Sequence, residues 1–308
     1  FGADGVGTFA SEGGDEAARV AVGKDVQGIK AVNQLDIPGL YTPGTVVVDY
    51  LGKRIVGQSI VPGIFKQREP GEHQIDYGGV EGKDVVAVHP DFVPVFEKLS
   101  KALRIKKHPV WDKDGKRHDL EGSVETKGLL GTDGRKYVLD LYRITPLDVS
   151  WFEDESSESY LHRMSTLRLE LVESYWRYKM GQYVREEVEK RRAKRAPERT
   201  AAENGEKKES TEDGEKKESS AENAEEDQDR IDVSNFHLAL NPDVFSGQVP
   251  QTDEEKEEWA KDEQEVRAAC DYLRNKVMPE LIQDLHDGDV GFPMDGQSLT
   301  QLLHKRGI

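Results

Sequence analysis

The chain has 308 residues and a formal net charge of −17, of which −15 lies after residue 150. This imbalance excludes a uniformly basic nucleic-acid binder but allows a local basic face. Hydrophobic residues make up 35% and charged residues 33%, so part of the chain is expected to bury little apolar surface. The length excludes a disulfide-stapled mini-protein.

Cys270 is the only cysteine, so no disulfide can form within the chain, and we expect a reducing, cytoplasmic setting. No apolar run approaches the roughly 18 residues that a membrane span needs, so we expect no membrane insertion. The chain begins at Phe1 without a methionine. We therefore expect it to be a piece of a longer protein.

The first stretch of interest, residues 1–25, is rich in glycine and lacks apolar periodicity, which predicts a flexible lead-in. From Thr45 to Val61, two β-branched runs around a glycine turn predict a hairpin. Residues 85–88 predict a strand. A short amphipathic helix is then predicted, with Asp91 as its cap and an apolar face of Phe92, Phe96, Leu99 and Leu103.

Further strands are predicted up to Arg143. Residues 108–120 have the pattern of a second hairpin, and residues 123–127 and 135–143 are predicted strands on either side of a glycine-rich turn at 131–134. On the last strand, Asp140 would share a face with Val138 and Tyr142. A carboxylate there needs a cation or an N–H partner, or else serves a metal or general-base role.

Beyond Trp151 the apolar period changes to 3.6 residues, which predicts a helix to about Arg195. Its expected packing face is formed by Tyr160, Met164, Leu167, Leu171, Tyr175 and Tyr178. Residues 198–229 hold 13 acidic and 5 basic side chains and no aromatic one. Such a segment cannot bury enough apolar surface to offset its ordering entropy, so we expect a disordered insert. Helical patterns resume after Ile231.

The sequence therefore predicts an α+β fold, in which a β-rich N-terminal half with hairpins and a mixed sheet packs with a helical C-terminal half. A disordered charged insert interrupts it. The expected boundaries are a flexible lead-in at 1–25, a β-rich half at 26–150, a long helical region at 151–196, the insert at 197–230, and a helical C-terminal part at 231–308.

Catalytic chemistry has little support in the sequence. The eight histidines show neither His-x-x-x-His nor His-Glu-x-x-His spacing, so no metal site is predicted. A glycine-rich stretch at residues 5–10 lacks the preceding strand that a dinucleotide site needs. Cys270 lies on the apolar stripe of a predicted helix, where a thiol ionises poorly. We predict no catalytic residue, no metal and no cofactor.

The densest motif lies between Lys127 and Asp148. Six of its residues are interpreted as a structural motif, namely Lys127, Asp133, Gly134, Arg135, Asp140 and Arg143. An alternative hypothesis is a nucleotide-binding or phosphoryl-transfer site centred on Lys127, Arg135 and Asp140.

Two clusters of cations are candidates for binding RNA phosphates, since only concentrated positive charge can hold a phosphate backbone on an acidic chain. The candidates are Lys101, Arg104, Lys106 and Lys107 in the first cluster, Arg191, Arg192, Lys194 and Arg195 in the second, and Lys136 as a weaker one. Each cluster alone is also compatible with a solvated helix end.

Four stretches carry a resemblance to a known family: residues 44–50, 54–64, 127–148 and 295–308. Together they resemble the central CLU domain of the clustered mitochondria proteins, in order, from about Val26 to Ile308. The charged insert departs from the pattern, so no function is assigned to it.

The resemblance implies a non-enzymatic cytoplasmic protein with further domains, which keeps mitochondria dispersed and binds mRNAs for nuclear-encoded mitochondrial proteins. The partners it implies are mRNA, a translation initiation factor complex or ribosome-associated proteins, and other domains of the same protein. A pure protein-interaction scaffold is the remaining alternative.

Overall fold

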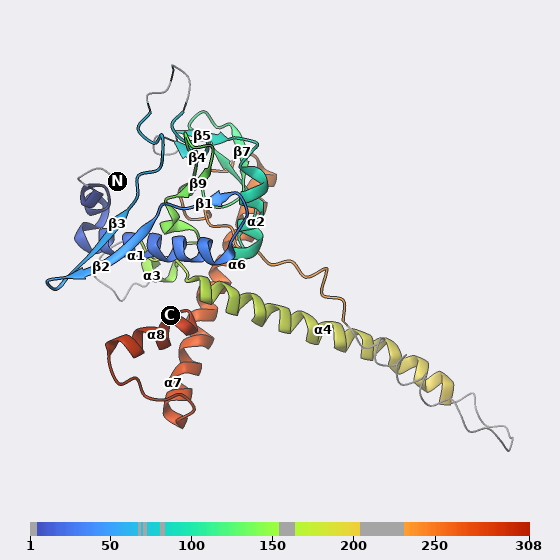
Figure 1. Cartoon of the computed structure of the whole chain (residues 1–308). Helices are drawn as coiled ribbons and strands as arrows, with labels where there is room; N and C mark the ends of the chain where they lie inside the picture. The colour runs from blue at the N-terminus through green and yellow to red at the C-terminus, as the bar shows by residue number, and fades with distance from the viewer. Residues whose placement is uncertain (1–4, 67–68, 70–72, 81–83, 154–163, 204–230) are drawn as a thin grey trace, which may run out of the picture. The chain divides into compact units, whose positions relative to one another are not determined.

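The computed structural model describes residues 5–66, 69, 73–80, 84–153, 164–203 and 231–308 (Figure 1). The chain forms two compact units. The first, which we call the body, comprises residues 1–174 and 239–308, and the second, which we call the helical unit, comprises residues 175–238.

The chain begins with a long helix, α1, over Gly5–Leu35. The structure therefore differs from the predicted flexible lead-in at 1–25. Ala17, Ala21 and Ile29 of this helix are buried. Small residues at helical spacing let its backbone approach the body closely, and such a stripe carries little of the apolar periodicity by which helices are predicted.

A five-stranded sheet forms the centre of the body in the order β1-β9-β8-β4-β5. Its strands are β1 (Leu40–Tyr41), β4 (Tyr77–Val80), β5 (Val85–Val88), β8 (Lys127–Leu130) and β9 (Lys136–Leu139). Only the β1–β9 pair is parallel. Helix α2 (Val93–Leu103) packs Phe96 against Tyr77, with ring centroids 4.3 Å apart.

Two separate ribbons confirm the predicted hairpins. Strands β2 (Thr45–Tyr50) and β3 (Lys53–Gln58) pair antiparallel. Strands β6 (His108–Trp111) and β7 (Arg117–Leu120) do the same. Tight glycine turns connect each pair, as the β-branched and glycine pattern indicates.

The region around Asp140 differs from its prediction. Strand β9 ends at Leu139, and Asp140 adopts a left-handed conformation with φ of 57° before a 3₁₀ turn, η2, over Leu141–Arg143. The predicted strand at 123–127 is likewise wrong, because β8 begins only at Lys127.

The long helix α4 runs over Leu169–Glu203, after a single helical turn, α3, at Ser150–Glu153. It starts later than predicted: Met164 precedes it in a non-helical segment, where Thr166 bridges Leu147. Tyr160 and residues 204–230 lie outside the described residues. The backbone of residues 197–203, assigned to the predicted insert, is helical.

The C-terminal part is helical, as predicted. It contains α6 (Asp253–Tyr272), a π-turn η3 (Leu273–Val277), α7 (Met278–Asp287) and α8 (Gly296–Arg306). Helix α6 starts with a capping box in which Thr252 and Glu255 each accept from the other's backbone N–H. The α+β class is therefore confirmed.

Two glycines of α1 test its attachment to the body. A Cβ on Gly28 would lie 2.5 Å from Cβ of Leu141, whereas one on Gly23 would meet nothing within 4 Å. We expect Gly28→Ala to destabilise the chain by about 1–3 kcal/mol, because the helix must shift. Gly23→Ala should stabilise it by up to about 1 kcal/mol. Urea unfolding of both variants checks this, and equal effects would contradict a docked α1.

Candidate functional site

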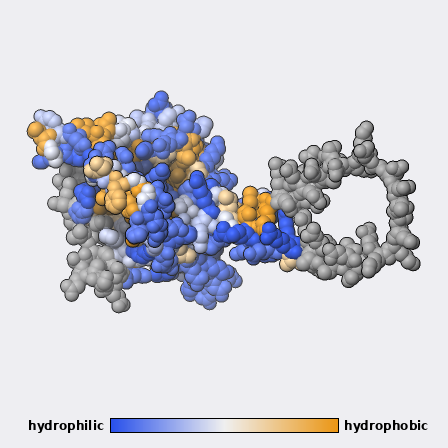
Figure 2. Space-filling model, turned by 90° about the horizontal axis from the view of Figure 1, so that it is seen from below, coloured by the Kyte–Doolittle hydropathy of each residue, from blue (hydrophilic) through white to orange (hydrophobic). Residues whose placement is uncertain are grey.

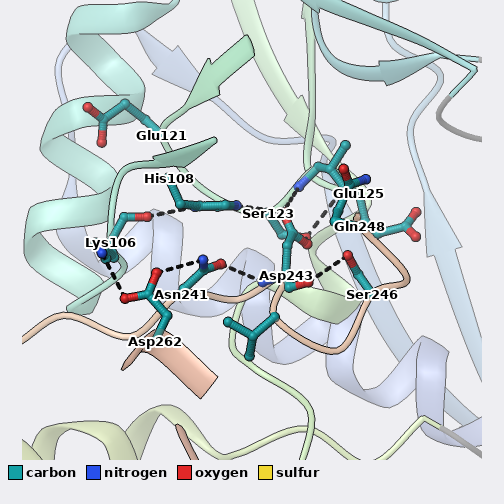
Figure 3. A network of polar contacts seen from close by, with 12 residues as sticks. Lys106, His108, Glu121, Ser123, Glu125, Asn241, Asp243, Ser246, Gln248 and Asp262 are labelled. Carbon is teal, nitrogen blue, oxygen red and sulfur yellow. Dashed lines mark hydrogen bonds and ion pairs between the residues drawn. The ribbon is translucent and has the colours of Figure 1, made fainter. Parts of the chain in front are cut away.

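A buried polar network of the body surrounds Asp243, in the segment that leads the chain into α6 (Figure 3). Its Oδ2 atom lies 2.7 Å from Nε2 of His108 and accepts from the backbone N–H of Val124 at 2.8 Å. Its Oδ1 atom accepts from the Ser123 hydroxyl at 2.9 Å. The carboxylate thus joins β6, the turn before β8 and the returning chain.

His108 contacts two acceptors at once. Its Nδ1 atom lies 2.8 Å from the carbonyl oxygen of Lys106, opposite the Asp243 contact. The ring therefore connects the backbone before β6 to the Asp243 carboxyl group. Removal of either side chain would leave buried polar atoms of the other without partners, which costs much stability.

The electrostatics of Asp243 follow from these donors. Burial alone would raise its pKa, but the hydrogen bonds from His108, Val124 and Ser123 outweigh burial and hold the pKa below its usual range. Ser123 is no activated nucleophile, because its hydroxyl donates to the carboxylate and not to the imidazole. The network is a structural clamp.

The clamp extends to the surface through Asn241. This side chain accepts from the Asp243 backbone N–H at 2.9 Å and donates to Asp262 of α6 at 2.9 Å. Asp262 also accepts from Lys106 at 2.7 Å, and Glu258 accepts from the same ammonium at 3.1 Å. Both carboxylates belong to α6, so Lys106 is bound to that helix.

A second polar cluster lies where α1 meets the segment before α4. Lys24 donates to the backbone oxygen of Thr166 at 2.6 Å. Burial and the nearby Arg168 guanidinium lower the pKa of Lys24 to about 8. Both residues line a cavity of about 20 Å³, which has room for one water molecule.

Asp148 and Cys270 form the adjoining part of this cluster. Asp148 accepts from Arg274 at 3.3 Å. Burial, together with the Asp148 charge, raises the pKa of the Cys270 thiol to about 12. A thiol that is buried and protonated is inert.

The Lys127–Asp148 motif is held by local pairs. Lys127 lies 2.7 Å from Asp140, and Arg143 lies 3.6 Å from Glu125. Near Asp140, the buried Asp25 of α1 accepts from the Leu141 backbone N–H at 2.8 Å. Burial raises the pKa of Asp25, although this hydrogen bond opposes the shift.

Arg135 does not join this group. It lies at the turn end of the β8–β9 hairpin, 3.8 Å from Asp133 and with its guanidinium 5.0 Å from the centre of the Tyr41 ring. Asp133 also accepts from the Tyr137 hydroxyl at 2.9 Å, and Gly134 supplies the positive φ of the turn. Lys127 lies at the opposite end of the hairpin, so no phosphate pocket gathers Lys127, Arg135 and Asp140.

Carboxylates occupy the first basic cluster. Lys101 pairs with Glu97 at 2.6 Å, Arg104 with Glu173 at 3.4 Å, and Lys107 lies 3.8 Å from Glu121. With Lys106 bound to α6, each of its four predicted cations has an acidic neighbour.

The second cluster lies on one helix. Arg191 and Arg192 belong to the part of α4 in the helical unit, and the helical backbone continues through Lys194 and Arg195, whose side chains lie outside the described part. In the same unit, Phe236 contacts Trp176 and Tyr183, with ring centroids 5.7 and 5.5 Å away.

Lys136 is separate from both clusters. It lies on β9, between Leu40 of β1 and Leu130 of β8. As a single cation on a central strand, it cannot by itself hold a phosphate backbone.

The described residues form neither a metal-ligand cluster nor a membrane-spanning helix. Within those ranges, no three His, Cys, Asp or Glu side chains come together as metal ligands would. No helix that the structure describes combines the length and apolar character needed to cross a bilayer.

Comparison with known proteins identifies the family. Residues 1–151 match the model of the CLU family, described as "Clustered mitochondria". Over its whole length the chain is 84% identical to the clustered mitochondria protein homolog of Emericella nidulans and 84% identical to that of Aspergillus oryzae. The chain belongs to the clustered mitochondria family.

A third relative, the homolog of Coccidioides immitis, is 79% identical over 311 aligned residues. The chain covers 25%, 24% and 24% of these three fungal proteins. It therefore spans about a quarter of the length of the clustered mitochondria relatives that it matches. No solved structure matches the chain.

Sequence reasoning missed the residues that build the clamp. His108 lacks metal-ligand spacing, and its partner Asp243 is 135 residues away in the chain. A short aspartate-containing loop, Asn241-Pro242-Asp243, has no pattern that indicates burial. Only an observed contact between the two segments could have found the pair.

The clamp predicts that the stability of the body depends strongly on Asp243. Asp243→Ala removes the partner of three buried groups, the His108 ring, the Ser123 hydroxyl and the Val124 N–H, so we expect a loss of about 3–5 kcal/mol in unfolding free energy. Asp119→Ala is the matched control, because Asp119 pairs with Arg117 at the surface and should cost less than about 1 kcal/mol. Urea denaturation followed by tryptophan fluorescence measures both, and similar losses would contradict the clamp.

Lys24 predicts a pH dependence. Its pKa is about 8 in the folded chain and about 10.4 when unfolded, so the unfolded state binds more protons between these values and stability rises with pH there. The raised pKa of the Cys270 thiol has the opposite effect, because it makes stability fall as the pH rises above about 8.5. We therefore expect the unfolding free energy of the wild type, minus that of Lys24→Met, to rise by about 2 kcal/mol from pH 7 to 10. Parallel pH profiles would contradict this prediction.

Proposed function

We propose that this chain is a non-enzymatic binding module of a cytoplasmic protein that distributes mitochondria, and that it contacts mRNA through the second basic cluster on α4. The names of the fungal relatives support the link to mitochondria. The density of cations along α4 carries the choice of RNA site.

The first cluster is poorly suited to RNA. A phosphate that binds Lys106 must displace Asp262 and Glu258, which lie 2.7 and 3.1 Å from its ammonium. Asp262 also accepts from Asn241 of the clamp, so release of Lys106 costs stability in addition to binding energy.

The second cluster concentrates its charge along one helix. Residues 191–195 contain four cations and no acid, and with a rise of about 1.5 Å per residue they occupy about 7.5 Å of helix axis. Such density favours a phosphate backbone. Aromatic rings in the same unit, including Trp176, are of the type on which unpaired bases stack.

The implied partners follow from this assignment. An mRNA held on α4 would bring translation initiation factors or ribosome-associated proteins near the same unit, while the body contacts other domains of the same protein. Lys127, Arg135 and Asp140 do not converge, so we do not propose nucleotide binding or phosphoryl transfer.

A titration with fluorescein-labelled poly(U) tests the assignment. The double variant Arg192→Glu with Arg195→Glu should bind about tenfold more weakly or worse, and the slope of log affinity against log salt should become shallower by roughly 1.4. The matched control reverses Lys256 and Lys261, which lie on α6 and change the net charge equally. Fluorescence anisotropy measures both. An equal loss in the control, or no binding at low salt, would refute the RNA assignment.

A further inference from the structure

The ribbon of β2 and β3 pairs only with itself among the described strands. In Figure 1 it is the pair of blue strands that crosses α1. A two-stranded ribbon is marginally stable in water unless one of its faces packs against something. The stability of the ribbon therefore depends on what each of its faces contacts.

One face lies against α1. Thr45 and Val47 of β2 line a groove with Val26 and Ile29 of α1, with a volume of about 360 Å³. Gln58 of β3, which pairs with Thr45, donates to Asp25 of α1 at 3.0 Å. This inner face also carries Asp49, whose carboxylate pairs with Arg54 across the strands at 2.7 Å.

The outer face is apolar and exposed. The register places Val46, Val48 and Tyr50 of β2 opposite Gly57, Ile55 and Lys53 of β3. Val46, Val48, Tyr50 and Ile55 are 61%, 48%, 64% and 52% exposed. Figure 2 shows apolar surface, in orange, in patches among hydrophilic side chains. A contiguous apolar face of β-branched and aromatic residues is typical of a protein interface.

We infer that a second copy of the chain covers this outer face, with the two ribbons stacked face to face around a two-fold axis that crosses the strands at Val48 and Ile55. Such an interface is isologous, because the same patch of each copy meets its equivalent. This inference is independent of the proposed RNA contact.

The outer face is complementary to itself under that axis. The axis reverses the strands, so the end with Tyr50 and Lys53 lies over the end with Val46 and Gly57 of the other copy. Tyr50 then lies over Val46 of the other copy and Lys53 lies over Gly57, so the larger side chains meet the smaller ones. At the axis, Val48 meets Val48 at the usual sheet-to-sheet spacing of about 10 Å.

Charge favours a second copy over an oppositely charged partner. Lys53 is the only charged residue on the outer face, and the axis separates the two copies of Lys53 by nearly the length of the ribbon. The ribbon carries one acid and two bases, so it is a part of this acidic chain where two copies repel each other little.

The apolar surface also extends beyond the strands. Leu51 at the turn and Ile60 after β3 are exposed. A stable interface buries on the order of 800 Å² per partner, and the four apolar side chains of the outer face need these additions to approach that area. We therefore expect a reversible dimer.

Adjacent valines provide matched variants. Val47 and Val48 are both 48% exposed but lie on opposite faces of β2. Sedimentation of the 308-residue chain over a range of concentrations should show a monomer–dimer equilibrium. Val48→Lys should raise the dimer dissociation constant by about tenfold or more, whereas Val47→Lys should leave it nearly unchanged.

A cross-link tests the two-fold axis with a smaller change that preserves folding. Val48→Cys should give a covalent dimer with a short bis-maleimide, and Val47→Cys should not. Background reaction is low because the natural Cys270 is buried. A wild type that stays monomeric at high concentration would overturn the inference, since the face is then covered by something else. Equal effects of the Val47 and Val48 variants would overturn the face-to-face arrangement.

Discussion

The body depends on the burial of one carboxylate. Asp243 is 1% exposed, and such a group is tolerated only when several donors meet it. These donors come from β6 and from the turn before β8, so the strands and the returning chain must assemble together. Next to the clamp, Leu240 bridges Ile105 and its backbone N–H donates to the Arg104 carbonyl oxygen at 2.9 Å. The chain thus leaves the body after Ser174 and returns to a fixed point. The entropy cost of closing this loop changes little with the number of residues between the two points.

Much of the β-rich half could be predicted because its signals are local. Two β-branched runs around Gly52 specify β2 and β3, and the apolar spacing from Phe92 to Leu103 specifies α2. Helix α1 could not be predicted in this way. Its buried stripe uses alanine and Gly28, and their value lies in allowing close approach to Leu141, a long-range contact that hydropathy does not record.

The candidate site was less predictable than the fold, because its chemistry is set by distant partners. The need of Asp140 for a charged partner was foreseeable, and Lys127 supplies it at 2.7 Å. The left-handed backbone of Asp140 was not foreseeable, since aspartate adopts this conformation only occasionally and the pattern around it predicts a continuing strand. The cations of the first cluster look alike in sequence, yet Lys106 binds Asp262 of α6, which lies more than 150 residues away in the chain.

The distribution of charge separates two kinds of surface. In the body, cations such as Lys106 are held by carboxylates, and its notable exposed feature is the apolar face around Val48. In the helical unit, charge is concentrated along α4. Phosphate contacts release counterions and weaken as salt rises, whereas apolar burial does not weaken and is strengthened by salts such as sulfate. The proposed association of two copies and the proposed contact with RNA should therefore respond oppositely to ionic strength. Each should change without affecting the other, because a contact at the ribbon uses none of the cations on α4.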